Sequence, residues 1–126
     1  MSEETFVGRY NTVMPYLIIF NAEGFSQFMK TVFGAIETYR AMTDDNIIMH
    51  GEVKIGDTII MFADANEQWQ QQNAGMFICV DDADATFNKA IQEGATVVTP
   101  LSDQNYGRTG GVKDPFGNTW WITKVK

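Results

Sequence analysis

The sequence predicts an α+β protein that consists of two tandem βαβββ modules. Residues 16–35 resemble residues 76–95, so part of the chain repeats with an offset of 60 positions (76 minus 16). Each copy begins with an apolar run and continues with a helical pattern, and strand-like segments follow it. The repeat divides a single domain into one module at 13–63, a loop at 64–75 and a second module at 76–125.

Each copy of the repeat contains one predicted helix. Asn21 in the first copy and Asp81 and Asp82 in the second can accept hydrogen bonds from the free N–H groups at a helix start. Gly34 and Gly94 stand where a left-handed residue ends a helix. Between these limits the apolar residues recur on one helical face. They are Phe25, Phe28, Met29, Val32 and Phe33 in the first copy, and Ala83, Phe87, Ala90 and Ile91 in the second.

Three further strands are expected after each helix. The pair Gly56-Asp57 is typical of a hairpin, and the segment from Asp114 to Gly117 is typical of a type I turn. The polar, Gln-rich segment between the modules is expected to be a loop. The strands predicted on this basis are 16–20, 36–42, 47–54 and 58–63 in the first module, and 76–80, 96–99, 109–113 and 119–125 in the second.

The charge balance excludes some classes of partner. The 126 residues carry a net charge of −7, with a pI near 4.5. Nucleic acid and anionic lipid are bound by clustered Lys and Arg, so neither a nucleic acid nor a membrane is an expected partner. The first ten residues are acidic rather than apolar, which argues against a secretory signal. Cys79 is the single cysteine and cannot form an intrachain disulfide, so a cytoplasmic protein is expected.

Three motifs carry a resemblance to a known superfamily. They are "VFGA", "VDDADATFNKAIQEGATVV" and "YGRTGGVKDPFGNTWWI", and with them the chain resembles the vicinal oxygen chelate superfamily of glyoxalases, extradiol dioxygenases and bleomycin resistance proteins. The segment "HGEVKIGDTIIMFAD" is similar to a glyoxalase-like subgroup associated with phosphonate operons. The resemblance implies two modules whose sheets curl around a cleft, helices on the outer faces, and a homodimer.

The metal ligands of the related enzymes are not matched in this sequence. The resemblance places the ligand positions at or beside Pro15, Gly75, the segment 60–62 and Trp121. A catalytic metal needs about three protein ligands with N, O or S donors. We therefore expect no metal and no cofactor. The resemblance implies that Trp121 replaces the usual acidic ligand with a large apolar ring, suited to contact an organic molecule or to fill space.

Strand alternation divides the side chains of the last strand between two faces, and the resemblance implies which of these faces lines the cleft. Trp121 is expected in the cleft, together with Thr119 and Thr123, while Trp120 faces the helix layer. The same alternation, applied to the first strand of each module, is expected to direct Leu17, Ile19, Phe77 and Cys79 into the cleft.

His50 and Glu52 are the candidate catalytic residues. They lie two positions apart on an expected strand, so their side chains share a face. They could act as an acid–base pair or a partial metal site, or they could belong to a half-exposed polar strand edge.

Further candidates for ligand binding come from the expected loops. Tyr106 and Arg108 lie in a glycine-rich segment that could form the rim of a pocket, with Arg108 binding a carboxylate or phosphate. The alternative is a hairpin loop with a surface ion pair. Trp69 in the 64–75 loop could cover the cleft or pack against a partner subunit.

These observations lead to one principal functional hypothesis and two alternatives. The principal hypothesis is a metal-independent protein that binds a small organic molecule, with Trp121, Phe77, Tyr106, Arg108 and Trp69 as contacts. The first alternative is a glyoxalase-like lyase or isomerase with an unusual metal site that uses His50 and Glu52. The second is a fold retained only for protein association.

Overall fold

A computed structural model describes residues 10–126 of the chain. The first module contains strand β1 (Tyr16–Ile19), helix α2 (Ala22–Phe33) and strands β2 (Ile36–Met42), β3 (Ile48–Ile55) and β4 (Thr58–Asp64). The second contains β5 (Gly75–Cys79), α3 (Ala83–Gln92), β6 (Thr96–Gln104), β7 (Gly107–Lys113) and β8 (Thr119–Val125). Each half has the order βαβββ, which confirms the expected repeat.

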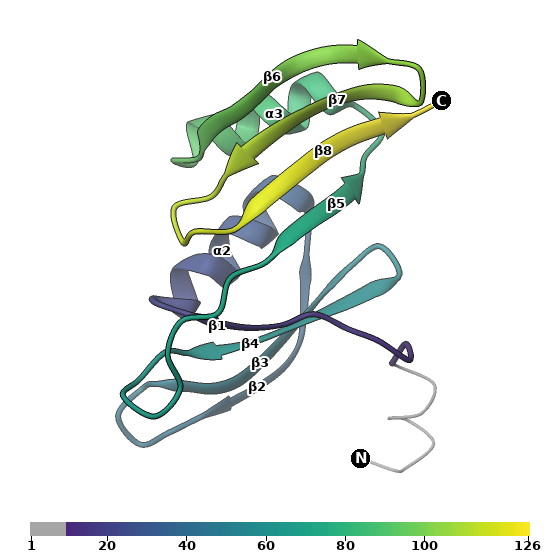
Figure 1. The fold of residues 1–126 in the computed structure, drawn as a ribbon. Coiled ribbons are helices and arrows are strands. Elements are labelled where there is room, and N and C mark those ends of the chain that lie inside the picture. The colour runs from purple at the N-terminus through teal and green to yellow at the C-terminus, as the bar shows by residue number, and fades with distance from the viewer. Residues whose placement is uncertain (1–9) are drawn as a thin grey trace.

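Each module forms its own four-stranded mixed sheet. The strand order is β1-β4-β3-β2 in the first sheet and β5-β8-β7-β6 in the second. The pairs β1–β4 and β5–β8 are parallel, and the remaining pairs are antiparallel. Figure 1 shows the two sheets as separate layers along the molecule, with β5 running beside β8 and β1 beside β4.

Asn21, Asp82 and Gly34 cap the helices as predicted, whereas α3 ends at Gln92 with Glu93 as its cap, one residue before the predicted Gly94. The side chain of Asn21 accepts a hydrogen bond from the Gly24 N–H at 3.0 Å, and that of Asp82 accepts one from Ala85 N–H at 3.0 Å. Gly34 ends α2 with a φ of 70°, a left-handed conformation that costs glycine little because it has no Cβ. These caps fix where each helix begins and ends on its sheet.

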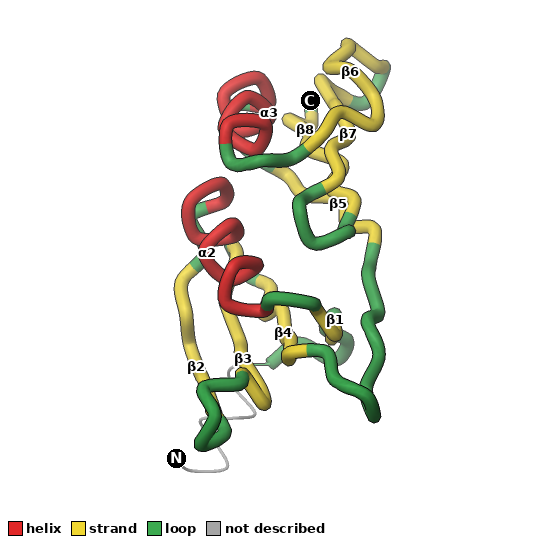
Figure 2. Tube along the Cα trace, turned by 90° about the vertical axis from the view of Figure 1, so that its left-hand side faces the viewer, coloured by secondary structure: helices red, strands yellow, loops and turns green. Residues whose placement is uncertain are grey.

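The two modules share one hydrophobic core. Figure 2 shows both helices on the same side of the molecule, with α2 next to α3. The ring of Phe33 at the end of α2 lies 4.5 Å from that of Trp120 on β8, and Phe25 packs edge-on against Phe116. Because α2 contacts side chains of both sheets, burial of this helix stabilises both modules at once.

The turn before β8 is organised by a buried carboxylate. Asp114 is 3% exposed and accepts hydrogen bonds from the backbone N–H groups of Phe116 and Asn118, both at 2.9 Å. Its other oxygen accepts one from Trp120 Nε1 at 2.8 Å. The Asn118 side chain in turn accepts the Ala74 N–H at 3.1 Å. The turn therefore closes the β7–β8 pair, positions Trp120 and holds the end of the linker.

The second-module hairpin is longer than predicted. Strand β6 continues to Gln104 and β7 begins at Gly107, whereas the sequence predicted strands at 96–99 and 109–113. Gln104 pairs with Gly107, so only a tight turn separates the strands. The turn and glycine residues concealed the strand periodicity here. Arg108 consequently lies on a strand and not in a loop.

Leu17 and Ile19 face the helix layer rather than the open face of the sheet. Both are at most 1% exposed and belong to the core, and their counterparts Met76 and Ile78 on β5 are partly buried and pack against the same core. The side chains of the two strands correspond at an offset of 59 residues (76 minus 17), one less than the offset of the Gly34–Gly94 helix ends. A slip of one residue reverses every side chain of a strand, so the prediction for these two residues was wrong.

No helix within residues 10–126 is both long and apolar enough to cross a membrane.

Candidate functional site

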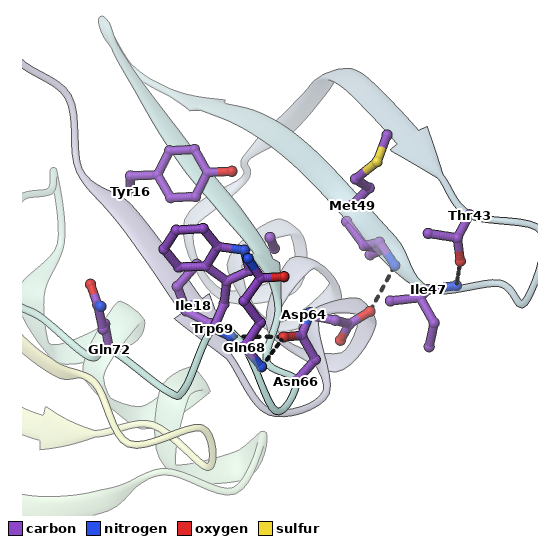
Figure 3. Close-up of a pocket in the computed structure, with 12 residues that line it drawn as sticks. Tyr16, Ile18, Thr43, Ile47, Met49, Asp64, Asn66, Gln68, Trp69 and Gln72 are labelled. Carbon is purple, nitrogen blue, oxygen red and sulfur yellow. Dashed lines mark hydrogen bonds between the residues drawn. The ribbon is translucent and has the colours of Figure 1, made fainter.

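A pocket of about 470 Å³ lies on the first sheet, beneath the linker between the modules. Tyr16 and Ile18 of β1 and Trp69 of the linker form its apolar side, and Met49 of β3 lies across from them (Figure 3). The remaining lining residues are Thr43, Ile47, Ile48, Ala63, Asp64, Asn66, Gln68 and Gln72. The pocket has a mainly apolar wall and a polar rim of amide side chains, as small-molecule sites often have.

Hydrogen bonds hold the linker against this pocket. Gln72 pairs with Ile18 through two backbone bonds, at 2.9 and 3.2 Å. The Asn66 side chain accepts hydrogen bonds from the N–H groups of Gln68 and Trp69, at 2.9 and 2.7 Å. These two hydrogen bonds hold the backbone of the linker so that the Trp69 indole lies over the pocket (Figure 3). The Trp69 side chain lies at the pocket of its own chain and remains 56% exposed.

Four polar side chains form a hydrogen-bonded chain on the open face of the first sheet. The Tyr10 hydroxyl lies 3.0 Å from both carboxylate oxygens of Glu52. Glu52 Oε2 lies 2.7 Å from His50 Nε2, and His50 Nδ1 lies 3.0 Å from the Tyr16 hydroxyl. Glu52 is 3% exposed, so its carboxylate depends on such bonds rather than on water. The predicted common face of His50 and Glu52 is confirmed.

Tyr16 connects these four hydrogen-bonded side chains to the pocket. Its ring lines the pocket while its hydroxyl contacts His50. Desolvation by burial raises the pKa of the Tyr16 phenol above its usual value, and the negative charge of Glu52 raises it further. Tyr16 is therefore a neutral phenol around neutral pH and offers a hydroxyl rather than a phenolate.

A smaller hollow of about 160 Å³ lies on the open face of the second sheet. Phe77 of β5 and Trp121 of β8 are direct neighbours in the parallel register, and the Tyr106 ring lies 6.5 Å from that of Phe77. All three side chains are more than a third exposed. Trp121 lines this hollow, and its six-membered ring lies over Gly111, where an added Cβ would meet it at 2.5 Å.

Arg108 does not line this hollow. Its guanidinium binds Asp84 at the start of α3, with Nε–Oδ1 at 2.5 Å and Nη2–Oδ2 at 3.3 Å, and it also binds Asp103 at 3.2 Å. The hydrogen bond from Arg108 lowers the pKa of the Asp84 carboxyl, with a further contribution from the positive charge. The structure thus contains the surface ion pair that was the alternative to a ligand-binding role.

The positions of the expected metal ligands carry few donor atoms. Tyr16, rather than Pro15, faces the open side at the start of the first sheet, and Met61 faces it on β4 beside His50 and Glu52. No cluster of three or more His, Cys, Asp or Glu side chains suited to a metal ion occurs among residues 10–126. His50 and Glu52 are close enough to act together, but they bond to each other and to the tyrosines.

The sequence did not identify Tyr10 or Tyr16 as site residues. Tyr10 precedes the first strand, so no periodicity describes it. Tyr16 begins a short apolar strand, and the 60-residue offset assigned the opposite face of that strand to the cleft. The alternation of Tyr16 and Ile18 with the core residues Leu17 and Ile19 was the available indication.

The protein has an α+β fold of paired βαβββ modules, and a hollow lies on the open face of each sheet. A family model described as the Glyoxalase/Bleomycin resistance protein/Dioxygenase superfamily matches residues 10–122. The chain belongs to this superfamily. An uncharacterized protein from Mycobacterium bovis is 32% identical over 118 residues, an alignment that covers 84% of this chain and 78% of the relative.

Solved structures share the same fold at lower sequence identity. TioX from Micromonospora sp. ML1 is 23% identical, with a TM-score of 0.73 over 92% of this chain and 97% of that protein. TnmS3 from Streptomyces sp. CB03234, described as an antibiotic binding protein, is 17% identical, with a TM-score of 0.70 over 93% and 100%. At these identities the likeness extends to the fold alone.

Proposed function

We propose that this protein binds a small organic molecule without a metal ion. The observation that carries the proposal is the pocket on the first sheet, with Tyr16, Ile18 and Trp69 on its apolar wall. Its volume of about 470 Å³ falls in the range typical of small-molecule sites. A relative of the same fold, TnmS3, is described as an antibiotic binding protein, which supports this class of function.

The charges of the lining residues favour a neutral or cationic ligand. Neither hollow has a Lys or Arg among the lining residues of the described chain, and the pocket is lined by Asp64, whose carboxylate also accepts hydrogen bonds from the N–H groups of Ala22 and Ile48. The net charge of −7 acts in the same direction. A ligand that depends on a carboxylate or phosphate group would lack a cationic partner at these surfaces.

We propose a homodimer in which the two hollows complete one cleft. Within one chain the pocket draws on residues 16–72 and the smaller hollow on residues 77–121. Both expose aromatic side chains, and exposed apolar patches of this kind mark sites of association. A second copy that places Phe77, Tyr106 and Trp121 opposite the pocket would enclose the ligand from both sides.

A screen with metal-free protein tests the binding proposal. The protein is dialysed against a chelator, and neutral and cationic aromatic antibiotics are screened by thermal shift and by tryptophan fluorescence. We expect at least one compound to raise the melting temperature to the same extent in chelated and in zinc-supplemented protein. Trp69→Ala should weaken this binding. Stabilisation that appears only after a metal is added would contradict metal independence.

A lyase or isomerase activity is the second candidate, because His50 and Glu52 form a bonded pair beside a pocket. Turnover of an α-oxoaldehyde–thiol adduct that is lost in both His50→Gln and Glu52→Gln would favour it. The conservative amide in each variant retains the size of the side chain and removes its acid–base function.

We also propose two finer assignments. Placement in the subgroup associated with phosphonate operons rests on the segment "HGEVKIGDTIIMFAD". A cytoplasmic location rests on the acidic composition and the single cysteine. Fractionation of cells that express a tagged chain tests the second assignment.

A further inference from the structure

The protonation state of His50 follows from its two neighbours. Glu52 Oε2 lies 2.7 Å from Nε2, and a carboxylate accepts hydrogen bonds, so Nε2 carries a proton. In the neutral imidazole the other nitrogen, Nδ1, is then an acceptor. The Tyr16 hydroxyl, 3.0 Å from Nδ1, therefore donates its single proton to His50.

This arrangement fixes what Tyr16 can offer to a molecule in the pocket. A phenol has one O–H to donate and lone pairs with which to accept. Because the proton is directed to His50, the oxygen of Tyr16 can only accept from a ligand. The raised pKa of Tyr16 keeps it in this neutral form. When His50 becomes protonated, Nδ1 donates instead, and the Tyr16 O–H is released to donate to the ligand.

The groups around His50 support this scheme. Glu52 approaches from the same strand, Tyr16 from β1, Tyr39 from β2 with its ring 6.0 Å away, and Tyr10 from the segment before β1. The facing side chain on β4 is the uncharged Met61. Within this described set, Glu52 is the charged group that faces the imidazole, and it determines which nitrogen is protonated.

We propose that Tyr16 is the specificity-determining hydrogen-bond acceptor of the pocket, and that it selects flat apolar ligands that present an N–H or O–H donor. His50 and Glu52 act as positioning residues that set the polarity of the Tyr16 hydroxyl. The inference rests on the proposed function, because it concerns the ligand of the same pocket. It adds a ligand class: aromatic molecules with a donor in the ring or attached to it, such as an indole, a phenol or an anilide.

The tautomer can be measured directly because the chain contains one histidine. A long-range ¹H–¹⁵N correlation spectrum of the uniformly ¹⁵N-labelled protein reports the two ring nitrogens of His50. Above the imidazole titration midpoint we expect a single tautomer with the proton on Nε2. In Glu52→Gln the spectrum should shift toward a mixture of tautomers. A proton on Nδ1 in the wild-type protein would make Tyr16 a donor and overturn the proposal.

Three matched probes test the selectivity: indole with an N–H donor, 1-methylindole without one, and 1-indanone with only an acceptor. Above the titration midpoint, indole should bind roughly fivefold more tightly than 1-methylindole, the effect of one net hydrogen bond. Below the midpoint this ratio should fall, and 1-indanone should bind more tightly than it does above the midpoint. Tyr16→Phe keeps the ring and should bring the ratio to about one at both pH values.

Trp69→Ala separates this proposal from the proposed function. If all three probes bind and Trp69→Ala weakens all of them, the pocket is a binding site. A wild-type ratio near one would then overturn the role of Tyr16 alone. If none of the probes binds the wild-type protein, the pocket and the role of Tyr16 are both overturned.

Discussion

Trp120 and Trp121 are adjacent in sequence and occupy opposite faces of β8. Trp120 is 1% exposed, packs at a tilt against Phe33 and donates its indole N–H to Asp114, whereas Trp121 is 37% exposed and lies over Gly111. The difference between the two is therefore one of environment and not of residue type. Trp120 serves the core, and Trp121 is available to a ligand or a partner.

Replacing each tryptophan with alanine should separate these roles. Trp120→Ala creates a cavity in the core and should cost about 3–5 kcal/mol of unfolding free energy. Trp121→Ala should cost less than about half of that, because part of its surface is already solvated. Urea unfolding measures both values. Equal losses would mean that Trp121 is also a core residue, and unchanged ligand affinity in Trp121→Ala would remove it from the binding site.

The carboxylate of Asp114 should contribute strongly to stability. Asp114→Ala leaves the Trp120 indole N–H and two backbone N–H groups without their acceptor in a buried site. We expect a loss on the order of 3 kcal/mol. Asp103→Ala, at an exposed carboxylate, is the matched control and should change stability little. Similar unfolding midpoints for the two variants would contradict the structural role of the turn.

At the scale of elements, an ion pair connects α3 to β7. Asp84 lies in the first turn of the helix and binds Arg108 on the strand. The acidic residue also lies at the positive end of the helix dipole. This ion pair therefore fixes α3 to its sheet. It accounts for an arginine at position 108 without any role in binding a ligand.

The stabilisation from this pair should depend on pH in one direction. The pKa of Asp84 is lower in the folded protein than its usual 3.8, so folding favours the ionised carboxylate. The contribution is present above pH ~4 and is lost as the pH falls through the folded pKa. Asp84→Asn should lower the urea midpoint at pH 7 and converge with wild type once the pH has fallen below the folded pKa of Asp84. Added salt should also reduce the difference, because the pair is exposed.

At the scale of the whole molecule, the open faces of the two sheets differ within residues 10–126: linker residues such as Trp69 lie over part of the first, whereas the second exposes large aromatic side chains. Phe77, Tyr106 and Trp121 form a continuous exposed aromatic patch on the second sheet. The faces of the sheets that carry the helices, by contrast, are buried in a shared core. This asymmetry is the physical reason to expect that a second copy covers the open faces.

Light scattering after size-exclusion chromatography should therefore give a mass of about 28 kDa, twice the chain mass of 14.2 kDa. Phe77→Glu places a charge in the aromatic patch and should shift the protein toward the monomer. Phe20→Glu is the matched control, because Phe20 is also exposed but does not line either hollow. A wild-type mass of one chain would refute the homodimer.

The sequence by itself determined the two βαβββ modules, their helix caps and the opposite faces of Trp120 and Trp121. These features depend on local periodicity and turn chemistry, which a single chain segment contains. The common face of His50 and Glu52 followed from the same alternation.

The tertiary structure alone decided which face of β1 is buried and which side chains meet at the pocket. A one-residue difference between the repeats reversed Leu17 and Ile19, because strand periodicity is two and the repeat offset is not uniform. Tyr10, Tyr16, His50 and Glu52 come from three separate segments, and their hydrogen bonds arise only when the sheet forms. Arg108 likewise acquired its partner Asp84 from α3, a pairing that no local pattern in the sequence indicates.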